Sequence, residues 1–105
     1  MQVIVHGIRL HEGVEPSQFE AWVREHDYPA CPRLPSVNAF TVHRVSAERD
    51  APVHFFEIIW ATSAEAFDRD MRSDVFRELS SGFAELASVV DEMSGAPLEP
   101  GYLAV

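Results

Sequence analysis

The sequence predicts an α+β protein of the ferredoxin-like class: a βαββαβ sandwich whose four-stranded antiparallel sheet has both helices on one face. Apolar residues recur at every second position in the strand-like segments and at three- or four-residue spacing in the helix-like segments. These segments follow one another in the order β-α-β-β-α-β, which is the order of that sandwich. No linker, repeat or low-complexity tract interrupts the 105 residues, so we expect residues 1–105 to form a single domain.

The first strand and the first helix have clear patterns. Residues 3–10 are mostly apolar and β-branched, as in a strand that is covered on both faces. One face of this strand would hold Ile4, His6, Ile8 and Leu10. Pro16 then suits the first position of a helix. The buried face of that helix would hold Phe19, Trp22, Val23 and His26, which recur at helical spacing.

Residues 26–37 are predicted to form a stiff, non-helical connection. Pro29, Pro32 and Pro35 each fix φ and lack an N–H donor, which disfavours a helix. Four polar or reactive side chains lie at the start of this connection: His26, Asp27, Tyr28 and Cys31. We expect the rigid connection to hold them in place, although a purely hydrated loop would have the same composition.

Two further strands follow the connection. Residues 37–45 alternate, with Phe40 and Val42 on one face. The strongest strand pattern covers residues 53–61, and one face of it would hold His54, Phe56, Ile58 and Trp60. The opposite face, which we expect to point away from the helices, would hold Phe55, Glu57 and Ile59. A carboxylate among so many apolar groups requires a partner, a proton or a cavity.

The second half of the chain contains the second helical region. Residues 62–65, Thr-Ser-Ala-Glu, have the spacing of a capping box, and a break is expected near Ser73 before a longer helix. The buried stripe of that helix would hold Phe76, Leu79, Phe83, Leu86 and Val90. Two prolines within residues 95–101 end the helix, and residues 102–105 are predicted to form the last strand.

Composition excludes several classes of partner. The net charge is −9, and all eight basic residues are Arg, so nucleic acid and anionic membranes are poor partners and a lysine Schiff base is excluded. No apolar run is long enough to span a membrane, and the strand-like N-terminus lacks the features of a secretory signal. The single Cys31 fits a reducing compartment, so a cytoplasmic location is expected.

The sheet is expected to pair with a second copy. Eight mostly apolar residues would lie on the face away from the helices: Val3, Val5, Val37, Ala39, Val45, Val53, Phe55 and Ile59. Such a face is not stable in water unless it is covered. Packing two sheets face to face would cover it, so we expect a homodimer.

Two short motifs resemble a known superfamily. Residues 26–29, His-Asp-Tyr-Pro, followed by residues 34–37, Leu-Pro-Ser-Val, resemble the EthD-like stretch in which His-x-Pro precedes Leu-Pro-Gly. Residues 54–60 are similar to the His-x-x-Glu strand of a plant polyketide cyclase. The whole chain therefore resembles the dimeric α+β barrel superfamily. This superfamily includes antibiotic-biosynthesis monooxygenases, EthD-like proteins and the RedY-like proteins of bisindole natural-product clusters, to which the chain is most similar.

The resemblance implies a substrate pocket between the sheet and the helices of each subunit. Its walls would include Ile4, His6, Ile8, Trp22, His26, His54, Phe56, Ile58 and Trp60. The sequence departs from two members of the superfamily. Asp74 stands near the place where the cyclase has a catalytic histidine, and no histidine follows residue 54 to ligate haem as in the haem-degrading barrels.

Three histidines, His6, His26 and His54, are the candidate catalytic residues, because imidazoles both give and take protons near neutral pH. The candidate substrate-binding residues are Trp22, Tyr28, Phe56, Trp60 and Asp74. A divalent metal on the three histidines is an alternative, but the close ligand spacing of metal motifs is lacking, so no metal or other cofactor is expected. His43 and Glu57 are a further pair that would fix the dimer register or, less favourably, form a second catalytic centre.

We expect a cofactor-independent tailoring enzyme that acts on a small aromatic, possibly bisindole, substrate. Aromatic walls would stack on the substrate, and histidines would catalyse a dehydration, cyclisation or tautomerisation as general acid and base. Such an enzyme would be a lyase of secondary metabolism. The alternatives are a cofactor-free monooxygenase and a non-catalytic binder of a reactive intermediate.

Overall fold

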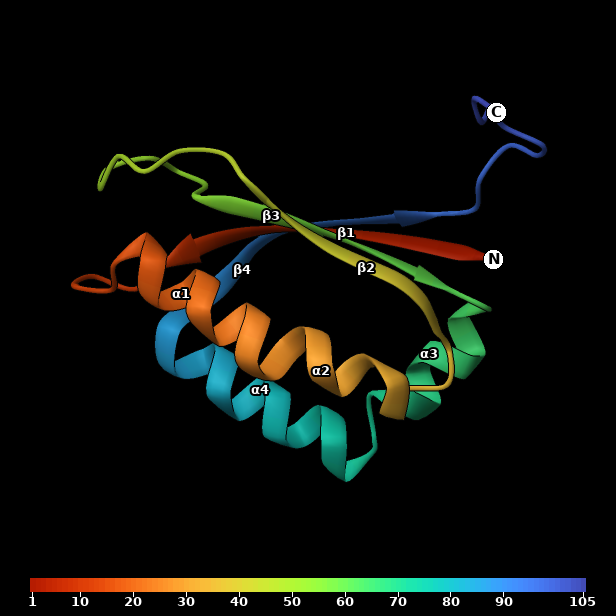
Figure 1. Ribbon diagram of the computed structural model, residues 1–105, viewed down its shortest axis with the longest axis horizontal. Helices are drawn as coiled ribbons and strands as arrows, with labels where there is room; N and C mark the ends of the chain where they lie inside the picture. The colour runs from red at the N-terminus through yellow and green to blue at the C-terminus, as the bar shows by residue number, and fades with distance from the viewer.

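A computed structural model describes residues 1–105 and shows one sheet with a layer of helices on one side of it (Figure 1). The strands are β1 (Gln2–Leu10), β2 (Val37–Arg44), β3 (Phe55–Ala61) and β4 (Ala87–Gly95). The helical segments are α1 (Pro16–Trp22), η1 (Val23–Asp27), α2 (Tyr28–Ala30), η2 (Cys31–Arg33), α3 (Ala64–Asp70) and α4 (Asp74–Leu86). No helix is long and apolar enough to cross a membrane.

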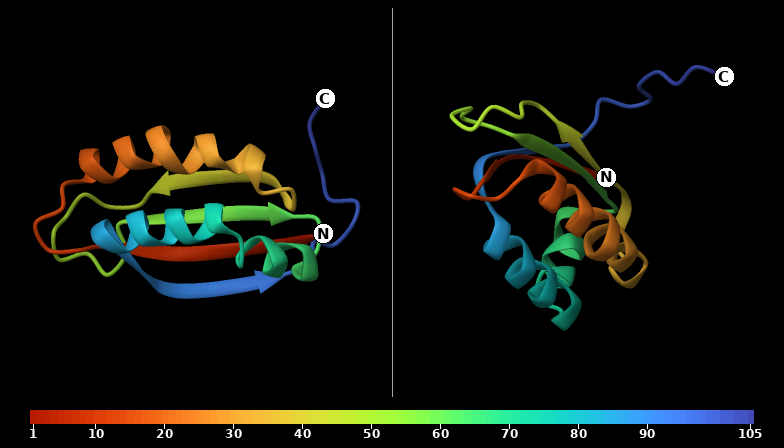
Figure 2. Two further views of the ribbon diagram at one scale, coloured as in Figure 1. Left: turned by 90° about the horizontal axis from the view of Figure 1, so that it is seen from below. Right: turned by 60° about the vertical axis from the view of Figure 1, so that its left-hand side comes forward.

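The four strands form one antiparallel sheet in the order β2-β3-β1-β4. The two central strands, β1 and β3, run under both helical arms, which lie side by side on the same face (Figure 2). The predicted fold class, a ferredoxin-like α+β sandwich, is therefore confirmed.

The core is divided into two hydrophobic clusters. The larger cluster packs the ends of β1 and β3 against α1, and it consists of Ile8, Leu10, Phe19, Val23, Phe55 and Ala87. The smaller cluster packs the other ends of β1 and β3 against α3, and it consists of Ile4, Ile59, Ala61 and Phe67. The inward positions between them hold His6 on β1 and Glu57 on β3, so a polar pair lies in the middle of the sheet.

The prediction of a non-helical connection after the first helix was wrong. The chain remains helical from Pro16 to Arg33 through four consecutive segments, α1, η1, α2 and η2. Pro29 and Pro32 each lie in the first two positions of a new segment, α2 and η2. A missing N–H is tolerated there, because the first turn of a helix does not use that donor. The prolines therefore segment the helix and do not end it.

The two faces of β3 are the reverse of the prediction. Phe55, Glu57, Ile59 and Ala61 are buried toward the helices, whereas Phe56, Ile58 and Trp60 are half-buried on the outer face. Both faces of this strand are apolar, so period two shows which residues share a face but not which face meets the helices. His43 and Glu57 lie on opposite faces, and the contact predicted between them is absent: His43 stacks on Phe56, with ring centroids 4.6 Å apart.

The last strand is also earlier than predicted. Helix α4 ends at Leu86, and β4 takes up residues 87–95, including Val90. Val90 continued the helical spacing of the stripe, but it belongs to a β-branched pair, Val89-Val90, that suits a strand. Residues 96–105 have no regular structure and extend on the side of the sheet away from the helices (Figures 1 and 2).

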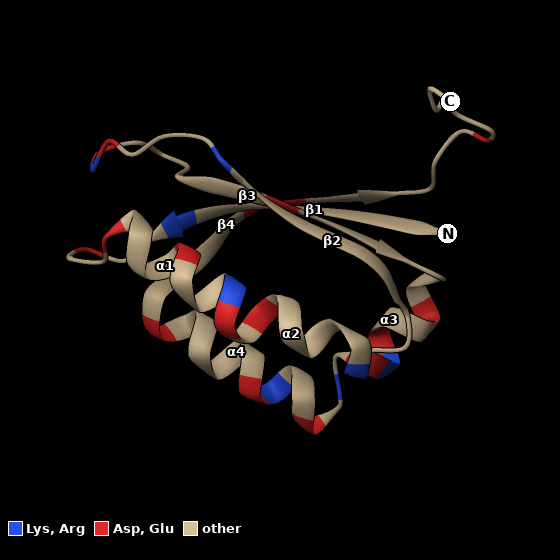
Figure 3. Ribbon diagram, in the orientation of Figure 1, with Lys and Arg blue, Asp and Glu red and all other residues tan.

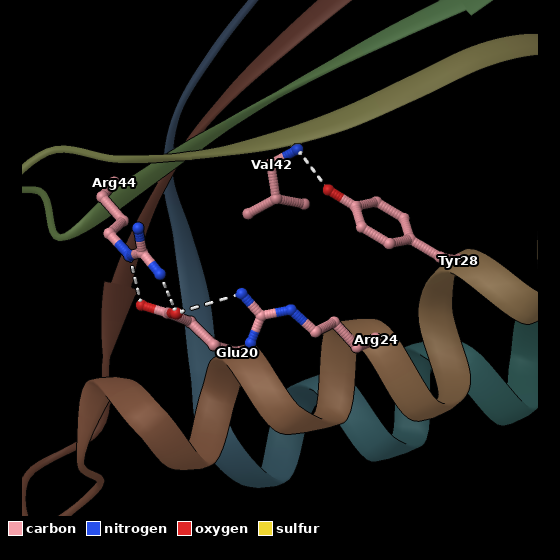
Figure 4. Close-up of polar contacts among 5 residues, drawn as sticks. All are labelled: Glu20, Arg24, Tyr28, Val42 and Arg44. Atoms are coloured by element: carbon pink, nitrogen blue, oxygen red, sulfur yellow. Dashed lines mark hydrogen bonds and ion pairs between the residues drawn. The ribbon is translucent and has the colours of Figure 1, made fainter.

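Polar contacts attach the first helical arm to the edge strand β2 (Figure 4). Arg44 donates to both carboxylate oxygens of Glu20, at 2.8 Å from Nε and 2.6 Å from Nη2. The Tyr28 hydroxyl accepts from the backbone N–H of Val42 at 3.0 Å. These contacts hold α1 and α2 over the sheet and cover part of its edge.

Candidate functional site

A cavity of about 400 Å³ lies between the sheet and the helices. Fourteen of its 22 lining residues are hydrophobic, as is typical of a site for a small organic molecule. The aromatic lining residues are Trp22, Phe40, Phe67, Phe76 and Phe83. The ionisable lining residues are His6, Asp27, Cys31, Glu57, Asp68 and Glu92.

The sheet register brings a histidine between two carboxylates. His6 on β1 pairs with Glu57 on β3 and with Glu92 on β4. Its Nδ1 lies 2.8 Å from Glu57 Oε2, and its Nε2 lies 2.7 Å from Glu92 Oε2. The Glu57 side chain is 12 % exposed and the Glu92 side chain is 67 % exposed, so the chain of groups runs from the interior to the protein surface.

Both carboxylates favour the charged imidazole. The hydrogen bond to Glu57 raises the pKa of His6 above its usual value. The charge of Glu57 and the contacts with Glu92 act in the same direction, whereas burial opposes them. With both ring nitrogens bonded to carboxylates, His6 holds its partners in place and has no free nitrogen with which to accept a proton.

A change of helix type places Asp27 in the cavity. Phe19 and Val23 are buried, and the next inward position of a regular α-helix would be residue 26. Val23–Asp27 instead forms a π-helical segment, in which each turn takes up one extra residue. The inward position therefore passes from His26, which is exposed, to Asp27, which lines the cavity.

The environment of Asp27 favours its protonated form more than that of an ordinary aspartate. Its carboxyl group makes no hydrogen bond within the protein and lines a cavity with mostly hydrophobic walls. Burial, with a smaller contribution from the charge of Glu57, raises the pKa of Asp27 to about 7. Two neighbouring carboxyl groups thus differ: Glu57 is bonded to an imidazole, and Asp27 both holds and releases a proton near neutral pH. Such a difference is characteristic of acid–base pairs in active sites.

Cys31 is one turn further along the same helical arm and also lines the cavity. Its Sγ lies 3.5 Å from the backbone oxygen of Asp27, as a donor. Burial, followed by the charges of Asp27 and Glu57, raises the pKa of Cys31 to about 11. A thiol that remains protonated is not a nucleophile, so Cys31 serves as an apolar part of the wall.

Of the three candidate catalytic histidines, only His6 lines this cavity. His26 is exposed on the first helical arm, with its ring 6.4 Å from that of Trp22. His54 is buried, but outside the cavity. Its Nδ1 accepts from the Leu10 N–H at 3.0 Å, and its Nε2 donates to the Glu48 carbonyl at 2.9 Å. Both nitrogens of His54 therefore hold the backbone, and its predicted position in the pocket was wrong.

The five candidate binding residues are also divided. Trp22 lines the cavity and packs closely on Gly82 of α4. Tyr28 is partly exposed and packs edge-on against Phe40, which does line the cavity. Phe56 and Trp60 are on the outer face of the sheet, as the reversed faces of β3 require.

Asp74 is exposed at the first position of α4, where it pairs with Arg77 at 3.4 Å. Its carboxyl group satisfies the positive end of the helix and does not reach the cavity.

Sequence reasoning did not place Asp27, Glu57 or Glu92 in this cavity, although it considered Glu57 with His43 as a second centre. Glu57 carried a signal, because a carboxylate in the centre of an apolar strand requires a partner. Asp27 carried a weaker signal, since it lies four residues after Val23 and eight after Phe19, but nothing in the residue pattern indicates the π-helical segment that favours it over His26. Glu92 lies on a strand that was not predicted. No three His, Cys, Asp or Glu side chains are arranged to hold a metal ion.

Comparison with protein families identifies the relatives of this fold and site. Residues 2–98 match the family described as REDY-like protein HapK. The chain belongs to this HapK family. The crystal structure of HapK from Hahella chejuensis is 44% identical, with a TM-score of 0.92 over 100% of both chains. No curated protein matches the sequence.

Two more distant structures share the fold. One is SnoaB, a cofactor-independent oxygenase from Streptomyces nogalater, at 20% identity and a TM-score of 0.72, with 95% of this chain and 97% of SnoaB covered. The other is an EthD-family protein from Bacillus halodurans, at 18% identity and a TM-score of 0.63, with 93% and 100% covered. The predicted resemblance to RedY-like, EthD-like and antibiotic-biosynthesis barrel proteins is thereby confirmed.

Proposed function

We propose that this HapK-family chain is a cofactor-independent enzyme that moves protons on a small aromatic substrate bound between the sheet and the helices. One observation carries the proposal: Asp27, an unpaired carboxyl group with a pKa of about 7, lies in an apolar cavity beside the His6-bound carboxylate of Glu57. A proton donor and a proton acceptor in one water-poor site are what acid–base catalysis requires.

The reaction that these groups support best is a dehydration, alone or as part of a cyclisation. Asp27 donates its proton to the hydroxyl oxygen of the substrate, and the carbon–oxygen bond breaks to release water. Glu57, through its free Oε1, removes a proton from the neighbouring atom, and that electron pair forms the new double bond. Transfer of the proton from Glu57 back to Asp27, through water or product, restores the starting state.

His6 acts in this scheme as a positioning residue. Its Nδ1–H fixes Glu57 Oε2, which leaves Oε1 toward the cavity, and its positive charge stabilises the carboxylate before the proton arrives. The aromatic walls, including Trp22, Phe76 and Phe83, suit a planar substrate. Aromatic natural products, bisindoles among them, are the proposed class.

A second candidate is a cofactor-free monooxygenase. One structural relative, SnoaB, is a cofactor-independent oxygenase, and the same first step serves that chemistry. Glu57 removes a proton from the substrate, the resulting carbanion adds O₂ to form a hydroperoxide, and loss of water leaves one oxygen atom in the product as a carbonyl. A third candidate is a binder that protects a reactive intermediate and turns nothing over.

One experiment separates the three candidates. The metabolite that accumulates in a strain lacking the gene is purified and incubated with the protein while dissolved oxygen is recorded. A product that has lost one water, with no oxygen consumed, supports the dehydratase proposal. Oxygen uptake with an oxygenated product supports the monooxygenase, and unchanged metabolite with saturable binding supports the binder.

A further inference from the structure

We infer that the cavity takes planar aromatic ligands that carry a positively charged, hydrogen-bond-donating nitrogen, and that it rejects aromatic carboxylates and phosphates. This inference rests on the proposed function, because it names the substrate class of the same cavity. Three properties of the lining carry it: unpaired acceptors, the absence of basic side chains, and aromatic walls.

Several carboxyl oxygens that line the cavity accept no hydrogen bond from the protein. Glu57 is only 9 % exposed and bonds through Oε2 alone, which leaves Oε1 without a donor. Both carboxyl oxygens of Asp27 also lack a protein donor. No fully buried side-chain oxygen lacks a hydrogen-bond partner, so these oxygens are open to the cavity, where a ligand that donates hydrogen bonds can reach them.

Most of the ionisable residues that line the cavity are acidic. Its only cationic group is His6, and both nitrogens of that ring are already bonded to carboxylates. No Arg lines the cavity, and the sequence has no Lys. Asp68 at the rim is paired with Arg72 at 3.2 Å, which leaves Glu57, Glu92 and, above its pKa of about 7, Asp27 to set the potential.

Acidic residues also predominate over the surface of the whole molecule, including the helical layer around the cavity (Figure 3). At about pH 8, where Asp27 is mostly ionised, an anion would therefore meet repulsion and find no free donor, whereas a cation is attracted inside a weakly polar enclosure. The remaining ionisable lining group, Cys31, keeps its proton and adds no charge near neutral pH.

The walls favour the same ligand. Trp22 and Phe83 stand 6.3 Å apart at a steep angle, and Phe67 and Phe76 form a second edge-to-face pair, also at 6.3 Å. Aromatic faces attract cations and stack on planar rings. A cationic aromatic also resembles the species left when hydroxide departs, so the carboxylates that bind it would stabilise the developing charge.

Three anthracene derivatives with one ring system test the inference without any turnover. Anthracen-9-ylmethylammonium, anthracene-9-methanol and anthracene-9-carboxylate are titrated against the full-length protein by fluorescence at about pH 8. We expect the ammonium to bind about tenfold more tightly than the alcohol, and the carboxylate about tenfold more weakly than the alcohol. A carboxylate that binds as tightly as the ammonium overturns the inference.

Two cavity variants and a matched control show whether the cavity carboxylates cause the preference for the ammonium. Asp27→Asn and Glu57→Gln should each reduce the preference for the ammonium several-fold. Asp91→Asn removes the same charge from β4 on the opposite face of the sheet, next to Glu92, and should leave the preference unchanged. A preference that survives both cavity variants, or that falls equally in the control, also contradicts the inference.

The experiments distinguish a failure of the proposed function from a failure of this inference. If Asp27→Asn loses turnover while the three ligands bind equally, the acid–base proposal stands and the substrate class is wrong. If the ammonium is preferred and Asp27→Asn still turns over normally, the cavity is selective but Asp27 is not its acid.

Discussion

A single extra residue in one helical turn favours Asp27 over His26 as the residue that faces the cavity. The apolar spacing of the first helix points to His26 as the inward residue, and a regular α-helix would place it there. The π-helical segment Val23–Asp27 advances the inward position by one residue. Exchanging an imidazole for a carboxyl group changes the chemistry of the site, because only the carboxyl group gains a proton on burial.

The first prediction compares Asp27 with its neighbour His26. Asp27→Asn should lower turnover of the substrate by about 10²–10⁴-fold, the usual contribution of one proton-transfer group. His26→Ala should leave turnover near that of the wild type, because the His26 side chain is exposed outside the cavity. Steady-state rates of the two purified variants check this. A large loss for His26→Ala with a small loss for Asp27→Asn would return the catalytic role to the histidine.

The second prediction concerns stability against pH. Because the folded state raises the pKa of Asp27 to about 7, it holds this proton more tightly than the unfolded chain does. The free energy of unfolding should therefore fall as pH rises from about 4 to about 7, by on the order of 3 kcal/mol. His6, whose pKa is also raised, contributes stability below pH 6.5 that is lost at higher pH.

Urea unfolding of the wild type and of Asp27→Asn at several pH values measures this effect. The variant should lose much less stability between pH 5 and pH 8 than the wild type, because the amide does not ionise. Parallel curves for the two proteins would show that Asp27 does not carry a raised pKa.

At the scale of elements, alternation showed which residues share a strand face but left open which face meets the helices. On β1 the inward set was predicted correctly: Ile4, Ile8 and Leu10 are buried, with His6 between them. On β3 both faces are apolar, and the inward set was reversed. Glu57 was the informative residue, since a carboxylate at the centre of a strand indicates a polar cavity as readily as a dimer contact.

The close packing of α1 on α4 gives the third prediction. A Cβ atom added at Gly82 would lie 2.8 Å from Nε1 of Trp22, which lines the cavity. Gly82→Ala gains about 1 kcal/mol of helix propensity but forces Trp22 to move, at a cost of about 1–3 kcal/mol. We expect a lower or unchanged melting temperature and an altered tryptophan fluorescence spectrum.

Ser81→Ala, at the exposed neighbouring position of α4, is the control and should leave the fluorescence spectrum unchanged. An unaltered spectrum in Gly82→Ala, with a raised melting temperature, would mean that the helices do not pack this closely.

At the scale of the whole molecule, the outer face of the sheet has the composition of an interface. The half-buried residues Val3, Val5, Phe56, Ile58 and Trp60 lie on this face, away from the helices. We propose that a second copy packs on it, as the sequence predicted, but with the outward residues of β3 in place of Phe55 and Ile59. Glu57 faces the cavity and takes no part in this contact.

The fourth prediction tests this assembly. Sedimentation of the wild type should show a dimer at micromolar concentration, and Ile58→Arg should shift it to a folded monomer, because a charge at the centre of a paired apolar face is unfavourable. Glu65→Arg, on the exposed surface of α3, is the control and should remain dimeric. A monomeric wild type that unfolds cooperatively would contradict the proposal.

The sequence predicted the fold better than the site, for a physical reason. Periodic burial is spread over many residues, so an error at one position does not change the element order. The site is built from His6, Asp27, Glu57 and Glu92, which lie on separate elements. The π-helical segment brings in Asp27, and the early start of β4 brings in Glu92. His6 and Trp22 were found because their elements follow the ordinary periods, and Asp27 was passed over because the same spacing favours His26 unless the helix takes up an extra residue.

The most direct test of the proposed site is the pKa of Asp27 itself, followed by carboxyl-carbon NMR of labelled protein across pH 3–9. We expect a midpoint of about 7, and a lower midpoint in Glu57→Gln, where the neighbouring negative charge is removed. A midpoint near 4, the ordinary value of an aspartate, would mean that Asp27 holds no proton at neutral pH and would contradict its role as the acid.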